Sequence, residues 1–207
     1  MEDIENIRKL CDLIGDKKFL YISGNGGAGK TTYAQKIKNF LEMKGKVVNL
    51  ISTDDFITDS KVRNNSKCEW LLNGKSYEGR YTSCCEESYF WNGLISVLYS
   101  LSVGCDICLK TKRNGMIRLH SGADLTIVEG IGTCFMSFDE QSVSLWFECE
   151  KETEIERRMK RGGLTREEVV SRIETRDSQF LANVLPNKFK FDWVIETNNE
   201  SLKIIKN

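Results

Sequence analysis

Residues 24–31 read GNGGAGKT, and this stretch decides the fold. It fits the pattern GxxxxGK[ST], in which glycines let the backbone curl so that successive N–H groups point inward at a phosphate. An apolar run over residues 19–23 comes directly before it, and a helical pattern follows directly after it. The sequence therefore predicts a strand, a phosphate-binding loop and a helix in succession. A glycine-rich turn without a ligand is the alternative.

Each residue type in this loop has an expected task. Lys30 is expected to bridge the β- and γ-phosphates of ATP, and Thr31 to bind the Mg²⁺ that links the same two phosphates. The predicted nucleotide-binding set is Gly24, Asn25, Gly26, Gly27, Ala28, Gly29, Lys30, Thr31 and Thr32, with Arg158 from later in the chain.

Five short apolar runs extend the pattern into a sheet. They end at Ser23, Ser52, Gly130, Cys149 and Thr197, and helical patterns separate most of them. Strands that alternate with helices form right-handed βαβ units, which build a parallel sheet with helices on both faces. The predicted fold is therefore α/β, with a doubly wound, five-stranded parallel sheet.

The remaining segments give more local predictions. Apolar residues at helical spacing predict helices over 3–14, 30–44 and 86–102, and a capping box at Thr165 and Glu168 opens another. A small antiparallel hairpin is expected with Asn114-Gly115 as a two-residue turn. The polar stretch 59–84 is interpreted as a lid or binding excursion.

The composition fits one domain over residues 1–207, with a substrate-side excursion, helix and hairpin over about 57–120. Thirty basic and thirty acidic residues cancel, so neither nucleic acid nor a membrane is expected as a partner. The expected partner is a small-molecule substrate, and a homodimer stays open. Without a secretory signal or a membrane span, a cytoplasmic location is expected, in which the eight cysteines are reduced thiols.

Acidic residues stand where two of the strands end. Asp54 and Asp55 follow the second strand, and Glu129 ends the third. In a doubly wound sheet, ligands bind at this edge. Asp54 is expected to accept a proton from an attacking hydroxyl and to hold magnesium, with Asp55 as the alternative base. Glu129 is expected to bind the magnesium or its waters. Capping residues and a structural carboxylate are the respective alternatives.

Basic residues gather in the segment ERRMKRGGLTR, residues 156–166. It contains a glycine pair and Arg157, Arg158, Arg161 and Arg166. Beside a phosphate-binding loop, this composition suits a closing lid over about 157–168, which neutralises charge on a transferred phosphoryl group. Arg157 and Arg161 are therefore predicted to be catalytic, together with Lys30 and Asp54. A solvated helix face is the alternative.

The order of these motifs resembles the uridine kinase, phosphoribulokinase and bacterial pantothenate kinase group of P-loop kinases. The resemblance covers most of the chain, through ISGNGGAGKTT, LISTDDF, ESYFWNGLISVLYSLSVG, IVEGI, ERRMKR and FDWVIETN. It implies that Asp54 is the general base, that Glu129 is the magnesium-associated acid, and that the arginines of ERRMKR form the lid. It also implies transfer of the γ-phosphoryl group of ATP, with Mg²⁺, to a hydroxyl of a small metabolite.

Two points stay open at this stage. The protein could instead be a P-loop ATPase or a nucleotide-gated regulator without a metabolite acceptor. The residues TSCCEESYF replace the Pro-Asp pattern of the uridine kinase nucleoside pocket, so the acceptor is not specified. A pocket between TDDF, the aromatic excursion and the hairpin is expected to use Arg80, Tyr81, Glu87 and Tyr89, for which surface or core packing is the alternative.

Overall fold

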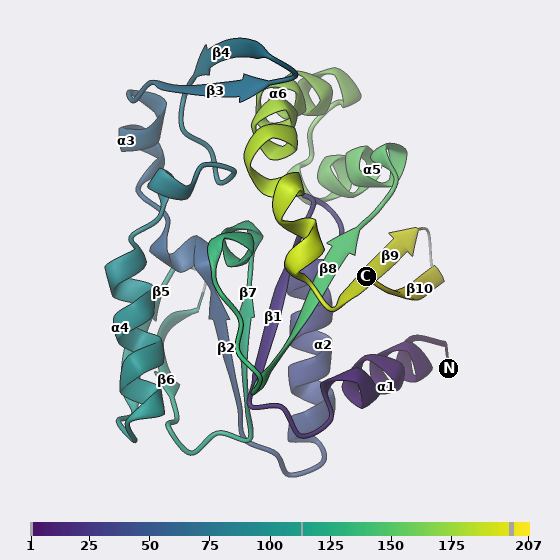
Figure 1. Ribbon diagram of the computed structural model, residues 1–207. Coiled ribbons are helices and arrows are strands. Elements are labelled where there is room, and N and C mark those ends of the chain that lie inside the picture. The colour runs from purple at the N-terminus through teal and green to yellow at the C-terminus, as the bar shows by residue number, and fades with distance from the viewer. Residues whose placement is uncertain (1, 113, 199–200) are drawn as a thin grey trace.

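A six-stranded sheet forms the centre of the computed structural model, which describes residues 2–112, 114–198 and 201–207 (Figure 1). The strand order is β10-β9-β8-β1-β7-β2. Five strands are parallel, as predicted: β1 (Phe19–Gly24), β2 (Val48–Ser52), β7 (Leu125–Glu129), β8 (Ser142–Glu148) and β9 (Trp193–Asn198). The sixth, β10 (Ser201–Lys206), was not predicted and runs antiparallel along β9.

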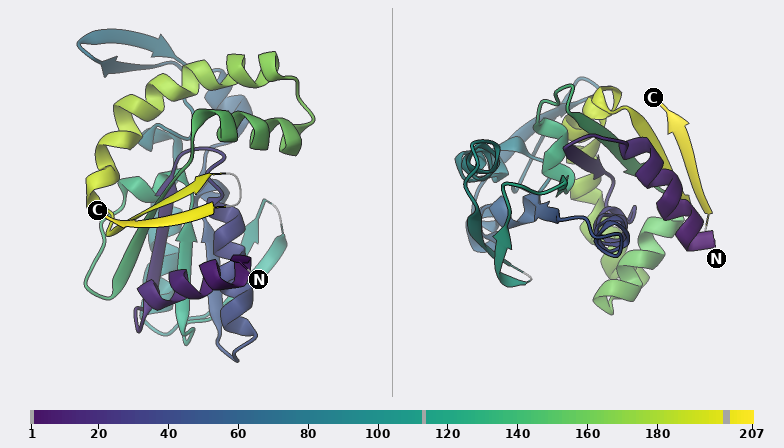
Figure 2. Two further views of the ribbon diagram at one scale, coloured as in Figure 1. Left: turned by 90° about the vertical axis from the view of Figure 1, so that its right-hand side faces the viewer. Right: turned by 90° about the horizontal axis from the view of Figure 1, so that it is seen from below.

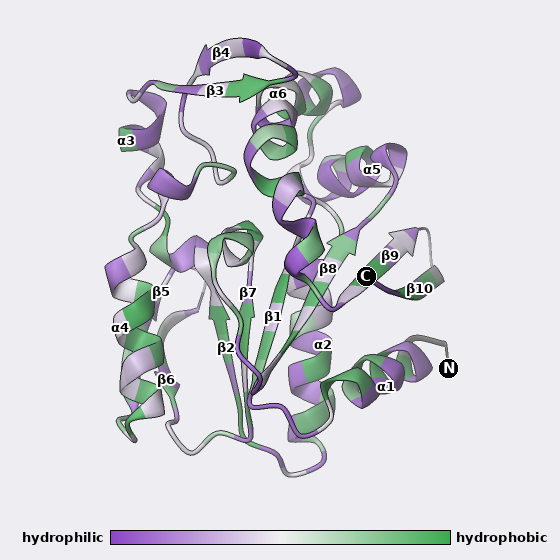
Figure 3. Ribbon diagram, viewed as in Figure 1, coloured by the Kyte–Doolittle hydropathy of each residue, from purple (hydrophilic) through white to green (hydrophobic). Residues whose placement is uncertain are grey.

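The central strands are continuous apolar runs because both of their faces are covered. Leu20, Ile22, Ile127 and Leu145 are completely buried, and Figure 3 shows these strands in the green of apolar residues. The registers align the carboxyl ends of the strands, since β7 pairs Glu129 with Ile22 on one side and with Ser52 on the other. The loops that follow β1, β2 and β7 therefore meet at one edge.

Helices cover the two faces of the sheet (Figure 2). On one face, α1 (Glu2–Ile14) and α2 (Lys30–Glu42) pack on the largest core cluster. On the other, the π-helical turn Phe180–Val184, which follows α6 (Arg166–Gln179), packs on Trp146. The arginine-rich α5 (Lys151–Gly162) precedes α6. No helix in the described part of the chain is long and apolar enough to cross a bilayer.

The helix expected from residue 86 begins later, as α4 (Trp91–Ser102). Residues 86–88 form a separate 3-10 turn. The cause is a backbone connection to the segment after β2: Thr58 donates to the carbonyl of Ser88, and Phe90 donates to the carbonyl of Phe56, each at 2.7 Å. These bonds hold the chain extended around Tyr89, so α4 cannot start before it.

Two hairpins project from the sheet. The predicted one is present as β5 (Ile107–Thr111) and β6 (Gly115–Leu119), but Gly115 pairs with Thr111, so Asn114-Gly115 is not a two-residue turn. The excursion contains α3 (Ser60–Asn64) and an unpredicted hairpin of β3 (Cys68–Leu72) and β4 (Lys75–Gly79). Its turn is Asn73-Gly74, both with positive φ, which is the conformation that two-residue hairpin loops favour.

Trp146 offers a test of the face covered by the end of α6. Its side chain is completely buried, and its ring lies 6.0 Å from that of Phe180 and 5.3 Å from that of Phe191. Replacing it by alanine is expected to lower the free energy of unfolding by about 3–5 kcal/mol, measured by chemical denaturation. Phe189→Ala is the matched control, because this ring is 78% exposed and its loss should change stability by less than about 0.5 kcal/mol.

Candidate functional site

One cleft of about 1310 Å³ lies over the aligned carboxyl ends of β1, β2 and β7. The phosphate-binding loop and the start of α2 form its floor, together with the acids after β2 and β7. Residues of α5 and α6 line one side. Residues of α3, the segment after β4 and the β5–β6 hairpin line the other, and these elements stand apart from α5 in Figure 1.

The loop after β1 needs glycine where the chain passes close to its neighbours. Gly24 has φ 124°, and a Cβ there would lie 1.8 Å from the carbonyl oxygen of Phe147. A Cβ on Gly26 would lie 1.8 Å from a guanidinium nitrogen of Arg158. The loop is fixed further by Asn25, whose backbone N–H donates to Phe147 at 3.0 Å. The predicted loop is thus present, packed between β8 and α5.

Lys30 is buried inside this loop. Its ammonium donates to the carbonyls of Gly24 at 3.0 Å and Asn25 at 2.6 Å. Burial lowers the pKa of Lys30 to about 8, although the carboxylates of Glu129 and Asp54 raise it. A phosphate next to this ammonium would stabilise its charged form.

Thr31 and Glu129 meet beside the loop. The Thr31 hydroxyl donates to the Glu129 carboxylate at 3.0 Å. Burial raises the pKa of Glu129, while Ser52, Lys30 and Thr31 lower it and Asp54 raises it. A hydroxyl and two neighbouring carboxylates are oxygen donors of the kind that Mg²⁺ prefers. In the described part of the chain there is no group of three or more histidine, cysteine, aspartate or glutamate side chains that could hold a metal, so phosphates and waters would supply the remaining positions.

Asp54 and Asp55 lie in the 3-10 turn Thr53–Phe56 that follows β2, and both line the cleft. Asp54 lines the same cleft as Lys30 and Glu129, and its charge raises the pKa of both. The Asp55 carboxylate instead accepts a 2.7 Å hydrogen bond from the backbone N–H of Lys112 in the β5–β6 connection. The two neighbours therefore have different surroundings.

Three of the four arginines predicted from residues 156–166 line the cleft. Arg157 donates at 3.0 Å to the carbonyl of Gly27 and to the hydroxyl of Thr197. Arg158 pairs at 2.6 Å with Glu154, and Arg161 lines the cleft at the end of α5. The fourth, Arg166, forms an exposed ion pair with Glu152 and does not line the cleft.

The predicted lid segment consists of the end of α5, a turn and the start of α6. Gly163 ends α5 in the left-handed conformation, with φ 60°, and the capping box of Thr165 and Glu168 begins α6. The lid function of this segment stays a prediction.

Sequence reasoning missed Glu154, which contacts the loop, and Arg176, which lines the cleft, because their helices also fit a solvated face. Glu154 is completely buried and accepts a hydrogen bond of 3.1 Å from the Asn25 side chain, so it joins the phosphate-binding loop to α5. Arg176, on α6, lines the cleft and donates at 3.1 Å to the hydroxyl of Ser83. The sequence gives no direct signal for either, since charged residues are expected along an exposed helix.

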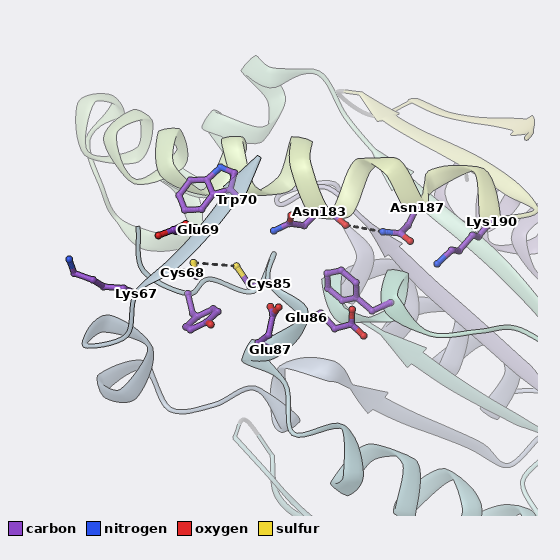
Figure 4. A pocket seen from close by; sticks show the side chains of 12 residues that line it. Lys67, Cys68, Glu69, Trp70, Cys85, Glu86, Glu87, Asn183, Asn187 and Lys190 are labelled. Atoms are coloured by element: carbon purple, nitrogen blue, oxygen red, sulfur yellow. Dashed lines mark hydrogen bonds between the residues drawn. The ribbon is translucent and has the colours of Figure 1, made fainter. Parts of the chain in front are cut away.

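The predicted acceptor residues are not brought together. Arg80 lines the cleft, whereas Tyr81 and Glu87 line a second pocket of about 600 Å³, whose lining includes Cys68, Cys85 and Asn183 (Figure 4). Tyr89 is buried; its hydroxyl donates to the carbonyl of Ser83, and burial raises its pKa. Arg80 and Tyr81 are consecutive residues after β4, yet they line different cavities.

The fold is similar to those of several solved structures. A possible uridine kinase from Bacillus stearothermophilus matches 94% of this chain and 99% of its own, with a TM-score of 0.56 and 16% identity. A D-glycerate 3-kinase from Cryptococcus neoformans matches 97% and 99%, with a TM-score of 0.64 and 10% identity. The phosphoribulokinase from Rhodobacter spheroides matches 90% and 73%, with a TM-score of 0.59 and 13% identity.

These likenesses confirm the predicted fold, a mostly parallel α/β sheet of the kind found in uridine kinase and phosphoribulokinase. No protein-family model and no curated protein matches the sequence.

The lowered pKa of Lys30 predicts a pH dependence of ATP binding. Below about pH 8 the ammonium is already charged, whereas above it Lys30 must take up a proton when phosphate binds. The Kd for ATP is expected to rise with pH above 8, by up to about tenfold per unit. Titration calorimetry at pH 9 in buffers of different ionisation enthalpy measures the proton uptake. Lys30→Met should bind more weakly and lose this uptake, and a wild-type uptake near zero would contradict the assignment.

Proposed function

We propose that this chain is an ATP-dependent kinase that transfers the γ-phosphoryl group to a hydroxyl of a small metabolite. One observation carries the proposal: a single cleft contains both the phosphate-binding loop and Asp54. Its volume of about 1310 Å³ exceeds the usual range for one small ligand, up to about 1,000 Å³, which supports a second substrate beside the nucleotide.

The nucleotide binds along the phosphate-binding loop. The loop N–H groups and the N-terminus of α2 contact the phosphates, and Lys30 neutralises the β- and γ-oxygens. Thr31 and Glu129, with Asp54, would hold Mg²⁺, which would offset negative charge on the phosphates. This use of Glu129 fits its position, because a buried carboxylate next to Lys30 and Thr31 is placed to receive a cation.

Asp54 acts on the acceptor. In this role its carboxylate orients the attacking hydroxyl and accepts its proton as the bond to phosphorus forms. Asp55 is instead bound to the β5–β6 connection, where its carboxylate accepts a hydrogen bond from the backbone N–H of Lys112.

Cations from α5 and α6 neutralise the transferred group. Phosphoryl transfer is catalysed mainly by positioning and by stabilisation of charge on the equatorial oxygens. Arg158 and Arg161 line the cleft from α5, and Arg176 lines it from α6. Arg157 contributes by holding α5 against Gly27 of the loop.

The role of Asp54 is tested with a coupled ADP-release screen over nucleosides, sugars, polyols and hydroxy acids. With the acceptor that this screen identifies, Asp54→Asn is expected to lower acceptor-dependent turnover by about 100-fold or more, because the amide cannot take a proton. ATP affinity, measured by calorimetry, should change much less. Asp55→Asn is the matched variant and should retain more activity. Full activity in Asp54→Asn would reject the catalytic role of Asp54.

Arg176 allows a second test. Arg176→Gln is expected to lower kcat by at least about tenfold with a smaller effect on the KM for ATP, if its charge acts mainly on the transition state. Arg166→Gln is the control, because it removes the same charge from an exposed pair with Glu152 outside the cleft. Equal kinetics in the two variants would show that Arg176 has only a structural role.

A further inference from the structure

We propose that the acceptor is an anion, a hydroxy compound with a carboxylate or phosphate group that Arg63 and Arg80 bind. This inference rests on the proposed kinase function and specifies its substrate class. It comes from the side of the cleft that lies away from α5, where α3, the segment after β4 and the β5–β6 hairpin contribute Arg63, Arg80 and Lys112.

In the part of the chain that the structure describes, the side chains of these three cations donate to neutral groups. Arg63 donates from Nε to the carbonyl of Thr58 at 2.9 Å, and Lys112 donates to the carbonyl of Ile57 at 2.9 Å. Arg80 donates to the amide oxygen of Asn64. Within the described ranges, none of the three lies within ion-pair distance of a carboxylate, unlike Lys67, Arg118 and Arg166, which pair with acids outside the cleft.

The two arginines belong to one patch. Arg80 bonds to Asn64, and Asn64 is the residue next to Arg63 on α3. Both guanidinium groups use one N–H in the bonds described, so each has further N–H groups for a ligand. A guanidinium presents these donors as a planar fork, which matches the two oxygens of a carboxylate or phosphate.

A hydrogen bond from α6 fixes the backbone of Arg80. Its carbonyl accepts a 2.9 Å hydrogen bond from Gln179, a completely buried side chain of α6. Arg63 is fixed by its bond to Thr58. A site with fixed donors loses less conformational entropy when it binds an anion than one built from mobile surface side chains.

The nearby acids do not neutralise the patch. Asp59 accepts from the backbone N–H of Lys61 as the N-cap of α3, and Asp55 accepts from the backbone N–H of Lys112. Asp54 is assigned to the reacting hydroxyl. The carboxylates on this side therefore already have hydrogen-bond donors or another task.

The charge of the whole cleft leads to the same conclusion. Ten of the side chains that line it are cationic and four are acidic. Six of the cations lie around the phosphate-binding loop and α5, and their positive charge is more than enough to balance the negative charge of MgATP. They are Lys30, Lys36, Arg157, Arg158, Lys160 and Arg161. A neutral acceptor would remove water from the opposite cations without giving them a partner, and this costs free energy. An anionic acceptor compensates for that loss.

The test compares acceptors in pairs that differ by one anionic group: D-glycerate with glycerol, a fructose monophosphate with fructose, and uridine monophosphate with uridine. ADP release and calorimetric binding in the presence of a non-hydrolysable ATP analogue are both measured. The charged member of at least one pair is expected to bind and to accelerate ADP release at least tenfold more efficiently than its neutral partner. Its KM should rise with ionic strength. The comparison of glycerate with glycerol tests whether the site binds a carboxylate, and the other two comparisons test whether it binds a phosphate.

Variants connect this preference to the patch. Arg63→Gln and Arg80→Gln are each expected to raise the KM for the charged acceptor at least tenfold, with a smaller change in kcat. Lys61→Gln is the matched control: it removes one charge from the same short helix, but Lys61 does not line the cleft, so the KM should stay unchanged.

Two results would overturn the inference. If neutral acceptors work as well as charged ones, or if the KM for a charged acceptor is the same in both arginine variants, the anion site is wrong and the kinase function stands. If ATP is hydrolysed at the same rate with and without every acceptor tested, the kinase function itself fails.

Discussion

The buried carboxylate of Glu154 ties the phosphate-binding loop to the arginine-rich helix, and the arrangement of the cleft depends on it. Glu154 is completely buried, pairs with Arg158 and accepts from the Asn25 side chain. A buried charge costs several kcal/mol unless it is paired and hydrogen-bonded, so these contacts cannot be broken singly without a large penalty. Arg157, one helix residue before Arg158, adds a bond to Gly27. The loop and α5 therefore form one rigid unit.

This rigidity explains the electrostatics of the floor. The cations of the floor are held close together without a phosphate. Burial lowers the pKa of Lys30, and the nearby Arg176 and Arg158 lower it further. Arg158, half-buried beside it, also has a lowered pKa, because of burial and the nearby Arg176. The cations destabilise one another while the site is empty. A bound phosphate removes this repulsion without rearranging the side chains, so its binding is more favourable.

The parts of the protein that follow from local rules were predictable from the sequence. The strand, glycine loop and helix around GNGGAGKT are present, and so are the acids at the ends of β2 and β7. These features depend on the local sequence and on the common direction of the parallel strands, whose carboxyl ends share one edge of the sheet.

Features that depend on contacts between distant segments were not predictable in this way. The β3–β4 hairpin carries an Asn73-Gly74 signal, but its strands are mostly exposed and lack clean apolar alternation. Glu154 and Arg176 have the residue types of a solvated helix face, and only the packed structure shows that they face the cleft floor and Ser83. Arg80 and Tyr81 were expected in one acceptor pocket, whereas Arg80 lines the cleft and Tyr81 lines the second pocket.

The end of α6 has one consequence for how the two substrates affect each other. Side chains of α6 and of the π-helical turn after it hold the segment between the cleft and the second pocket: Arg176 donates to Ser83, Gln179 to the carbonyl of Arg80, and Asn183, in the turn, to the carbonyl of Cys84. A displacement of α6 therefore moves the segment that carries Arg80. If nucleotide binding moves α6 through Arg176, it changes the affinity for the acceptor by some factor. Thermodynamic linkage then requires that acceptor binding change the affinity for the nucleotide by the same factor. In that case α6 couples the two halves of the cleft, so that binding in one half changes the affinity of the other.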